Sequence, residues 1–199
     1  MVRDEFTGEL LAARGDALVH RLVIPRPVAW VSTRSASGAD NLAPHSFFTV
    51  VSTRPSILMI SSIGFKDTAR NVIETGEFVV NVSSEANVES INLTATEYPP
   101  ELSEFDEVGV RRLRSILVNA PSVAESAAAM ECRLVRHEEI GNGFLLFGEV
   151  VAITVDPAVC GDRGPESGLL RPVARLGGIE WTTLGTVTRR KRMPFAPRN

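Results

Sequence analysis

A long hairpin in the second half of the chain constrains the fold more than any other feature. The segments "AMECRLVRHEEI" and "FLLFGEVVAITV" lie on either side of the turn "GNG" at Gly141–Gly143. Both segments carry many β-branched and apolar residues, which favour strands, and the Gly-Asn-Gly sequence favours a tight turn between antiparallel strands. We therefore expect two long paired strands, and a fold that depends on an antiparallel sheet.

Four shorter segments also have the residue types of strands, which brings the expected number of strands to six. They are residues 26–33, 45–53, 56–63 and 77–82. Regular alternation of strands and helices is absent after residue 100, which argues against a doubly wound α/β sheet. The pattern predicts a mainly β fold with inserted helices, in the form of a closed or nearly closed Greek-key barrel.

No linker divides the chain, so we expect one domain over residues 1–199. Residues 1–20 are predicted to form an N-terminal helical segment, residues 84–106 a helical insertion, and residues 186–199 a basic C-terminal tail. A further helix is expected to begin at Asp67 or Thr68, which are good N-caps, and to end at Gly76.

Charge and hydropathy argue against several classes of protein. The net charge of −3 gives no attraction to nucleic acid, and the basic run at Arg189–Arg192 lacks interleaved aromatic residues. That run is expected to be a solvated tail or an arm that reaches a dimer partner.

No apolar run approaches the roughly 20 residues that span a bilayer, and the N-terminus lacks a signal-peptide layout. We expect a cytoplasmic protein without membrane contact.

The residues that usually bind metals or act as nucleophiles form no recognisable motif. Cys132 and Cys160 lack metal-ligand spacing, and His20, His45 and His137 are far apart in the chain, so no metal site is expected. The sequence has no dinucleotide-binding glycine motif, P-loop, zinc-protease motif or nucleophile elbow, which leaves hydrolase as a weak option. The catalytic residues are not identified; His45 is a candidate, with a structural role as the alternative.

The segment "SSIGFKDTARN", residues 61–71, carries the residue types that bind a phosphate. Two hydroxyls end a strand, and a lysine and a threonine follow at the start of a helix. Ser62, Lys66 and Thr68 can converge on one anion, because the turn from strand to helix brings them to one side. The alternative is that Asp67 and Thr68 only cap the helix and Lys66 is solvated.

The segment "RPVAWVSTRSASGADNLAPHSFF", residues 26–48, points to an aromatic ring beside that phosphate. Ser32 and Thr33 end a neighbouring strand and are expected to add hydroxyls. "NLAPHSF" is expected to be irregular backbone whose free N–H and C=O groups need partners, and the edge of a flavin ring offers such partners. We therefore expect a small aromatic ligand that carries a phosphate.

These two segments together resemble the flavin reductase-like family of FMN-binding split-barrel proteins. "NAPSVAESAAAMEC", "LLFGEVVAITVD" and "RPVARLGG" also resemble segments of that family, in the same order. The resemblance implies a six-stranded Greek-key split barrel that forms a homodimer, with FMN near the subunit interface.

The resemblance also implies which residues bind FMN. The phosphate or ribityl side would be lined by Ser32 and Thr33, and the isoalloxazine would be bordered by Asn41, Ala43, His45 and Ser46. The phosphate and ribityl chain would be held by Ser61, Ser62, Lys66, Asp67 and Thr68, with Asn71 nearby. Arg175 would approach the flavin, with the other subunit as its possible source. Family members often have a tyrosine shortly after the "GG" pair, where this chain has Ile179, Glu180 and Trp181.

The resemblance implies an FMN-dependent oxidoreductase that transfers hydride from NAD(P)H to flavin. Such a reductase can supply a partner monooxygenase. Since the flavin carries the reactivity, the lack of a catalytic dyad is compatible with this function. Two alternatives stay open: a flavoprotein that acts on a specific organic substrate or electron carrier, and a non-catalytic FMN-binding protein.

Overall fold

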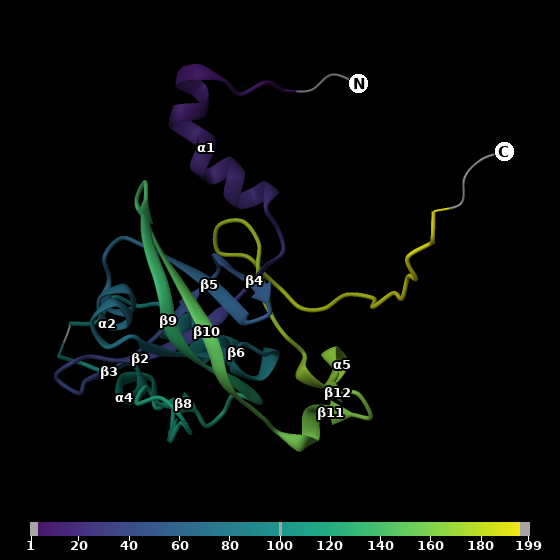
Figure 1. Cartoon of the computed structure of the whole chain (residues 1–199). Helices are drawn as coiled ribbons and strands as arrows, with labels where there is room; N and C mark the ends of the chain where they lie inside the picture. Colours follow the sequence, from purple (N-terminus) through teal and green to yellow (C-terminus); the bar gives the residue numbers. More distant parts are fainter. Residues whose placement is uncertain (1–3, 100, 196–199) are drawn as a thin grey trace.

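A computed structural model describes residues 4–99 and 101–195, and a seven-stranded antiparallel sheet forms its centre (Figure 1). The strands of this sheet are β2 (Ala29–Arg34), β3 (Asp40–His45), β4 (Phe48–Thr53), β5 (Ser56–Ile63), β6 (Glu77–Val82), β9 (Ala128–Ile140) and β10 (Gly143–Val155). Their order across the sheet is β3-β2-β6-β9-β10-β5-β4. The predicted mainly β class is therefore confirmed.

The predicted hairpin forms the middle of the sheet. β9 and β10 pair from Gly143 opposite Ile140 to Val155 opposite Ala128, with two irregularities in the register. On either side, β10 pairs with β5 and β9 pairs with β6. The hairpin thus connects the half of the sheet that contains β2 and β3 to the half that contains β4 and β5.

The two edge strands of the sheet, β3 and β4, follow each other in the chain. Only Ser46 and Phe47 separate them, and within the described residues no ladder of hydrogen bonds joins one to the other. The expectation of irregular backbone in "NLAP" is wrong, because these residues belong to β3 and pair with β2, Pro44 lying opposite Trp30. A proline is tolerated there because an edge strand needs no N–H donor on its outer side. This strand accounts for the difference between the six strands predicted and the seven observed.

Helix α2 (Asp67–Thr75) follows β5 directly and ends where the sequence predicts. Gly76 is its C-cap and has a φ of 74°, in the left-handed region that glycine adopts without strain. Thr68, Ala69, Asn71 and Val72 form its buried side. The helix therefore presents its polar first turn to one end of β5 while its apolar face packs on the sheet.

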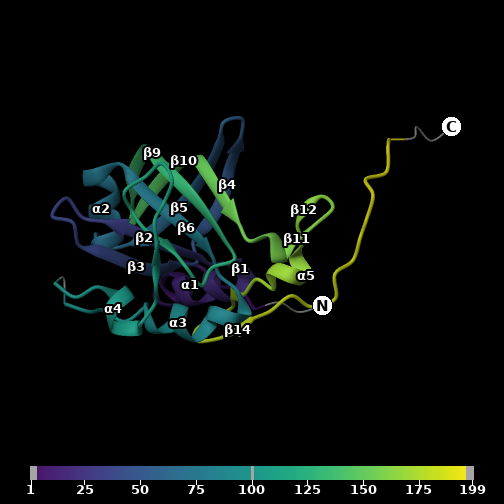
Figure 2. The ribbon, with the colours of Figure 1, turned by 90° about the horizontal axis from the view of Figure 1, so that it is seen from below.

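The other elements surround this sheet. They are α1 (Gly8–Leu22), β1 (Arg26–Pro27), η1 (Glu85–Asn87), α3 (Val88–Leu93), α4 (Glu104–Val108), β7 (Arg112–Leu113), β8 (Ser122–Val123), η2 (Pro157–Val159), β11 (Cys160–Gly161), β12 (Gly164–Pro165), α5 (Ser167–Leu170), β13 (Ala174–Arg175) and β14 (Trp181–Thr182). Both views place α2 and the small unit of β11, β12 and α5 at opposite ends of the molecule (Figures 1 and 2).

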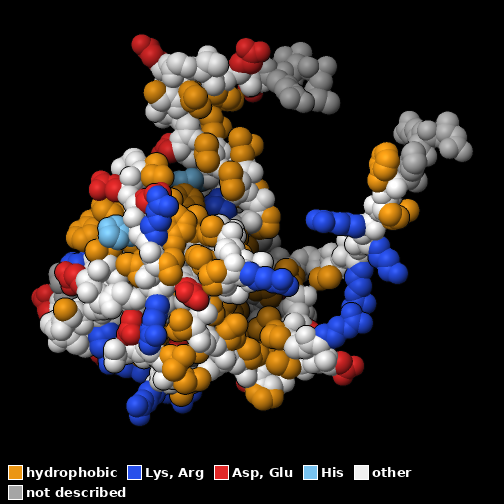
Figure 3. All heavy atoms as spheres, viewed as in Figure 1, with side chains coloured by type: hydrophobic (Ala, Val, Ile, Leu, Met, Phe, Trp, Pro, Cys, Tyr) orange, Lys and Arg blue, Asp and Glu red, His pale blue; other side chains and the backbone are white. Residues whose placement is uncertain are grey.

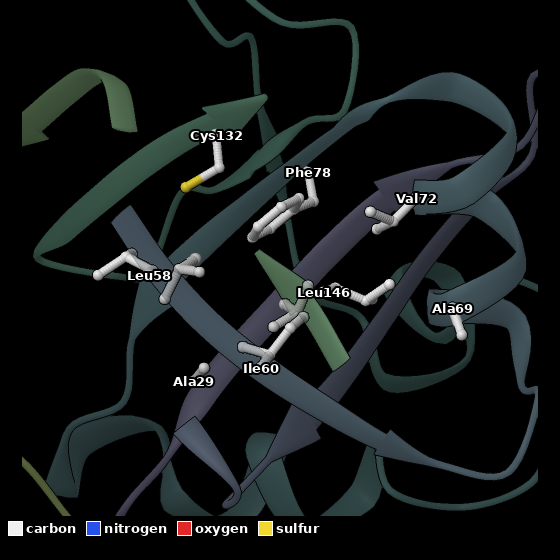
Figure 4. Close-up of a cluster of buried hydrophobic side chains, with 10 residues drawn as sticks. Ala29, Leu58, Ile60, Ala69, Val72, Phe78, Cys132 and Leu146 are labelled. Carbon is white, nitrogen blue, oxygen red and sulfur yellow. The ribbon is translucent and has the colours of Figure 1, made fainter. Parts of the chain in front are cut away.

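Among the described residues, three clusters of buried side chains pack against the sheet, of which two border the helices. Phe78, Ile60 and Leu146 are fully buried in the first, between the strands and α2 (Figure 4). The second contains Trp30 and Phe105 and joins the sheet to α3 and α4. Because β2 contributes to both of these clusters, its side chains are buried on both faces.

The three segments that were predicted to flank or interrupt the sheet differ in how much regular structure they contain. α1 accounts for most of the expected N-terminal helical segment; η1 and α3 lie within the expected insertion, and α4 begins within it and ends two residues beyond it. Residues 186–195 of the expected tail form neither helix nor strand. Residues 1–3, 100 and 196–199, which belong to these three expectations, lie outside the described residues. Among the residues that the structure describes, no helix has the length and apolar character needed to cross a membrane.

Candidate functional site

A cavity of about 540 Å³ opens where β3 passes into β4, beside the end of β5 and the first turn of α2. Its volume is typical of small-molecule sites, which span about 300–1,000 Å³. Nine of the residues predicted from the sequence line it: Asn41, Ala43, His45, Ser46, Ser61, Ser62, Lys66, Asp67 and Thr68. The two sequence segments that predicted a ligand therefore meet in one place.

Hydrogen bonds between buried side chains fix one wall of this cavity. The His45 Nε2 atom lies 3.2 Å from Thr68 Oγ1, which also accepts a hydrogen bond of 3.2 Å from Asn41 Nδ2. Asn41 Nδ2 also donates to Thr33 Oγ1 at 3.2 Å, and Asn71 Nδ2 donates to the same oxygen at 3.0 Å. The network links β2, β3 and α2, so that the side chains of this wall have little freedom.

His45 is electrically neutral at pH 7. Burial lowers the pKa of its imidazole to about 4; a hydrogen bond with the Ser61 backbone opposes this effect, and the nearby charge of Lys66 adds to it. His45 can therefore donate or accept a hydrogen bond in the cavity, but it adds no positive charge at neutral pH.

The end of the cavity at α2 has the groups that bind an anion. The first turn of a helix presents unpaired N–H groups, and Lys66 is the residue that precedes this turn. The Ser62 hydroxyl is buried beside it and donates to the backbone oxygen of Gly64 at 3.1 Å. Arg70 also lines the cavity and pairs with Asp67.

Apolar and aromatic side chains also line the cavity, and two of the residues in this set, Phe65 and Tyr98, are chain neighbours of Lys66 and Glu97. These side chains belong to Ala43, Pro44, Phe47, Ile63, Phe65 and Tyr98. The Phe65 ring packs on Phe144 of β10 with the centroids 5.2 Å apart. An apolar, aromatic wall next to an anion-binding end suits a ligand that has both a flat ring system and a phosphate.

Several residues that line the cavity were not predicted from the sequence. The largest group is the turn after α3, residues 94–98, whose approach depends on how the helical insertion folds back on the sheet. His20 reaches the rim from the end of α1. The buried Glu104 of α4 accepts the backbone N–H of Leu42 at 2.9 Å, and burial raises the pKa of its carboxyl. None of these contacts has a signature in sequence spacing.

Four residues predicted to bind the cofactor do not line the cavity. Thr33 and Asn71 are buried behind its wall, in the network described above. The Ser32 hydroxyl donates to the backbone oxygen of Pro121. Arg175 lies in the small sheet formed by β1, β13 and β14, with its guanidinium 4.8 Å from the centre of the Trp181 ring. The expected approach of Arg175 from another subunit stays a prediction.

Across residues 4–99 and 101–195, no cluster of three or more His, Cys, Asp or Glu side chains is arranged to hold a metal ion.

Residues 19–165 match the protein family described as Flavin reductase like domain. Among solved structures, component B of nitrilotriacetate monooxygenase from Bacillus cereus has a TM-score of 0.88 and 33% identity, over 95% of this chain and 98% of that chain. The 2-nitrobenzoate 2-nitroreductase of Pseudomonas fluorescens has a TM-score of 0.86 and 28% identity, over 94% of each chain.

A third structure, a protein with a split barrel domain from Shewanella frigidimarina, has a TM-score of 0.85 and 22% identity, over 98% of this chain and 100% of that chain. At this identity the likeness concerns the fold alone. The antiparallel sheet whose edge strands β3 and β4 are not joined to each other is thus the sheet of a split barrel.

Proposed function

Because this chain belongs to the flavin reductase-like family, we propose that it is an FMN-dependent oxidoreductase that transfers hydride from NAD(P)H to flavin. The observation that carries the proposal is the cavity, whose lining combines the cation Lys66 at the first turn of α2 with apolar and aromatic side chains that include Phe47, Phe65 and Tyr98. FMN needs both, since it has a terminal phosphate dianion and a flat ring system.

The residues present fit FMN in chemical type. Lys66, the first turn of α2 and the Ser61 hydroxyl would hold the phosphate, and the Ser62 hydroxyl, which donates its proton to Gly64 O, would accept a hydrogen bond from the ribityl chain. The polypeptide between β3 and β4 has backbone groups outside the sheet ladders, and these would bind the edge of the ring system. The backbone oxygen of Phe47 is not among these free groups, because it accepts a hydrogen bond of 2.9 Å from the N–H of Ser61.

A bound flavin supplies the ring that accepts and gives up hydride. The chain itself supplies position and environment. Hydrogen bonds within the chain hold the wall of His45, Thr68 and Asn41, so these side chains would need no ligand contact to keep their positions. Neutral His45 holds Thr68 in place and adds no second positive charge beside Lys66.

We also propose a homodimer, on the evidence of α1. None of the fifteen residues of α1, all of which the structure describes, is buried. Leu11, Val19 and Leu22 are exposed on one side of the helix, and Figure 3 shows hydrophobic side chains along it. A helix with an apolar face and no intramolecular cover suits a subunit interface.

Two similar proteins of known structure support proposals about the electron acceptor of this protein. The similarity to a component B of a monooxygenase supports a role in supplying reduced flavin to a monooxygenase. A nicotinamide as the electron donor is part of the proposal. The similarity to a nitroreductase favours a second candidate function, the direct reduction of an organic substrate at the same cavity.

Stopped-flow absorbance of the FMN-loaded protein mixed anaerobically with NADH or NADPH tests the proposal. We expect the oxidised-flavin band to bleach within seconds, and steady-state turnover with free FMN as acceptor. Bleaching without turnover on free flavin, but with turnover on a nitroaromatic acid, would support the second candidate. Tight FMN binding with no bleaching in minutes would contradict both and indicate a non-catalytic FMN-binding protein.

A further inference from the structure

An ion pair lies at the anion-binding end of the cavity. The Lys66 Nζ atom is 2.5 Å from Glu97 Oε1, and both residues line the cavity. Lys66 comes from the start of α2, whereas Glu97 comes from the turn after α3, so that the pair bridges two sides of the opening. The neighbouring ammonium lowers the pKa of the Glu97 carboxyl, which is therefore ionised at neutral pH.

Buried contacts hold Glu97 in this position. Thr94, three residues earlier, is 1% exposed and accepts a hydrogen bond of 2.9 Å from the indole N–H of Trp30. Backbone hydrogen bonds from Ala95 and Thr96 to the end of α3 shape the turn that follows. Glu97 thus extends from an anchored turn toward Lys66, although its own side chain is 81% exposed.

The same end of the cavity has a second cation that is also paired. Arg70 binds Asp67 within α2, and both residues line the cavity. Lys66 and Arg70 are therefore each matched by a carboxylate of the chain itself. An anionic ligand that binds Lys66 must displace Glu97 or share the ammonium with it.

We propose that Glu97 competes with the phosphate of FMN for Lys66, and thereby keeps FMN exchangeable rather than permanently bound. This inference rests on the proposed function. As the phosphate leaves, Glu97 takes its place on the ammonium, which favours dissociation. A reductase that releases reduced flavin to another protein needs such exchange, so Glu97 is a residue that determines ligand affinity and not a catalytic residue.

The expected change in FMN affinity is small, because both side chains of the ion pair are exposed to solvent. The Lys66 and Glu97 side chains are 59% and 81% exposed, and solvent screens such a pair strongly. Removal of the competing carboxylate should therefore tighten FMN binding only about three- to fivefold. Riboflavin lacks the phosphate, so its affinity should stay the same.

The test is equilibrium titration of wild type and Glu97→Gln with FMN and with riboflavin, followed by quenching of flavin fluorescence. We expect the FMN Kd to fall about three- to fivefold, the FMN dissociation rate to slow by a similar factor, and the riboflavin Kd to be unchanged. Glu89→Gln is the matched control, because Glu89 is exposed on α3 and is not among the residues that line the cavity. It should change neither Kd.

A double-mutant cycle with Lys66→Met distinguishes competition for the Lys66 ammonium from direct repulsion between the Glu97 carboxylate and the phosphate. In the Lys66→Met background, the Glu97→Gln substitution should no longer tighten FMN binding appreciably. An equal gain in both backgrounds, an equal gain for riboflavin, or no gain in wild type would overturn the inference while leaving FMN binding intact. Failure of the wild type to bind FMN at all would instead overturn the proposed function, and this inference with it.

Discussion

Trp30 of β2 donates its indole N–H to the hydroxyl of Thr94, 2.9 Å away, and this buried bond connects the sheet to the end of α3. Thr94 also donates to the backbone oxygen of Ile91. The pair sets the position of the turn that lines the cavity, so the helical insertion and the site are physically linked.

Replacement of Thr94 by the isosteric valine tests this link. Thr94→Val leaves the buried indole N–H without a partner, which costs about 1–3 kcal/mol in free energy of unfolding. Urea denaturation followed by tryptophan fluorescence measures the loss. Thr96→Val, two residues further along and exposed, should have almost no effect. Equal stability of the two variants would show that the Trp30 bond does not anchor the turn.

Lys66→Met tests the anion-binding end of the cavity. Loss of the one lysine that lines it should weaken FMN binding about tenfold, since a charge-assisted hydrogen bond to the phosphate disappears. The riboflavin Kd should not change, and the ratio of the two affinities is the measured quantity. A parallel loss of riboflavin affinity would indicate damage to the site as a whole rather than loss of a phosphate contact.

The lowered pKa of His45 predicts a pH dependence of stability. Between about pH 6.5 and pH 4 the unfolded chain protonates this residue while the folded protein does not. Stability should therefore fall as the pH is lowered through this window, by about 3 kcal/mol in total, and the contribution of His45 should level off below it. His45→Gln should reduce this slope in denaturation curves recorded at several pH values, whereas a substitution of the exposed His137 should leave it unchanged.

Gly148 of β10 has no room for a side chain. A Cβ atom at this position would lie 2.3 Å from the ring of the buried Phe78 and 3.0 Å from Cβ of Cys132. Gly148→Ala should therefore lower the free energy of unfolding by about 1–3 kcal/mol through overpacking. Gly168→Ala is the control, because a Cβ there meets no atom within 4 Å. Similar melting temperatures for the two variants would contradict this account.

The apolar face of α1 should control the oligomeric state. Leu11→Glu combined with Leu22→Glu places two charges on that face, and we expect the proposed dimer to dissociate in light scattering coupled to gel filtration. Ala13 lies on the opposite side of the helix at 100° per residue, so Ala13→Glu should leave the mass unchanged. A wild-type protein that elutes as a monomer would refute the proposed dimer.

Local patterns in the sequence predicted much of the fold and part of the site. The hairpin and α2 follow from residue types, turn chemistry and capping, which act over a few residues. Ser62, Lys66 and Thr68 come together because one strand-to-helix turn contains all three. The roles of these residues in binding FMN stay predictions.

Other features depend on contacts between distant segments. "NLAP" becomes a strand because β2 offers it a partner, and Pro44 fits since the strand is at an edge. Thr33 was expected in the cavity, but β2 is buried on both faces, and its pattern does not reveal which face borders a ligand. Residues 94–98 reach the cavity through the bond of Thr94 to Trp30, 64 residues away, which no local pattern encodes.

The break between β3 and β4 gives the sheet a mechanical property. Since no ladder of hydrogen bonds joins β3 to β4 within the described residues, a small change in sheet twist can alter the distance between them while the existing ladders stay intact. The bonds from Ser61 N–H to Phe47 O and between His45 and Thr68 limit that change, so we expect the ligand site to adjust its width by small amounts only. Variants that shorten or stiffen the two-residue link of Ser46 and Phe47 should alter which ring systems fit without altering the rest of the sheet.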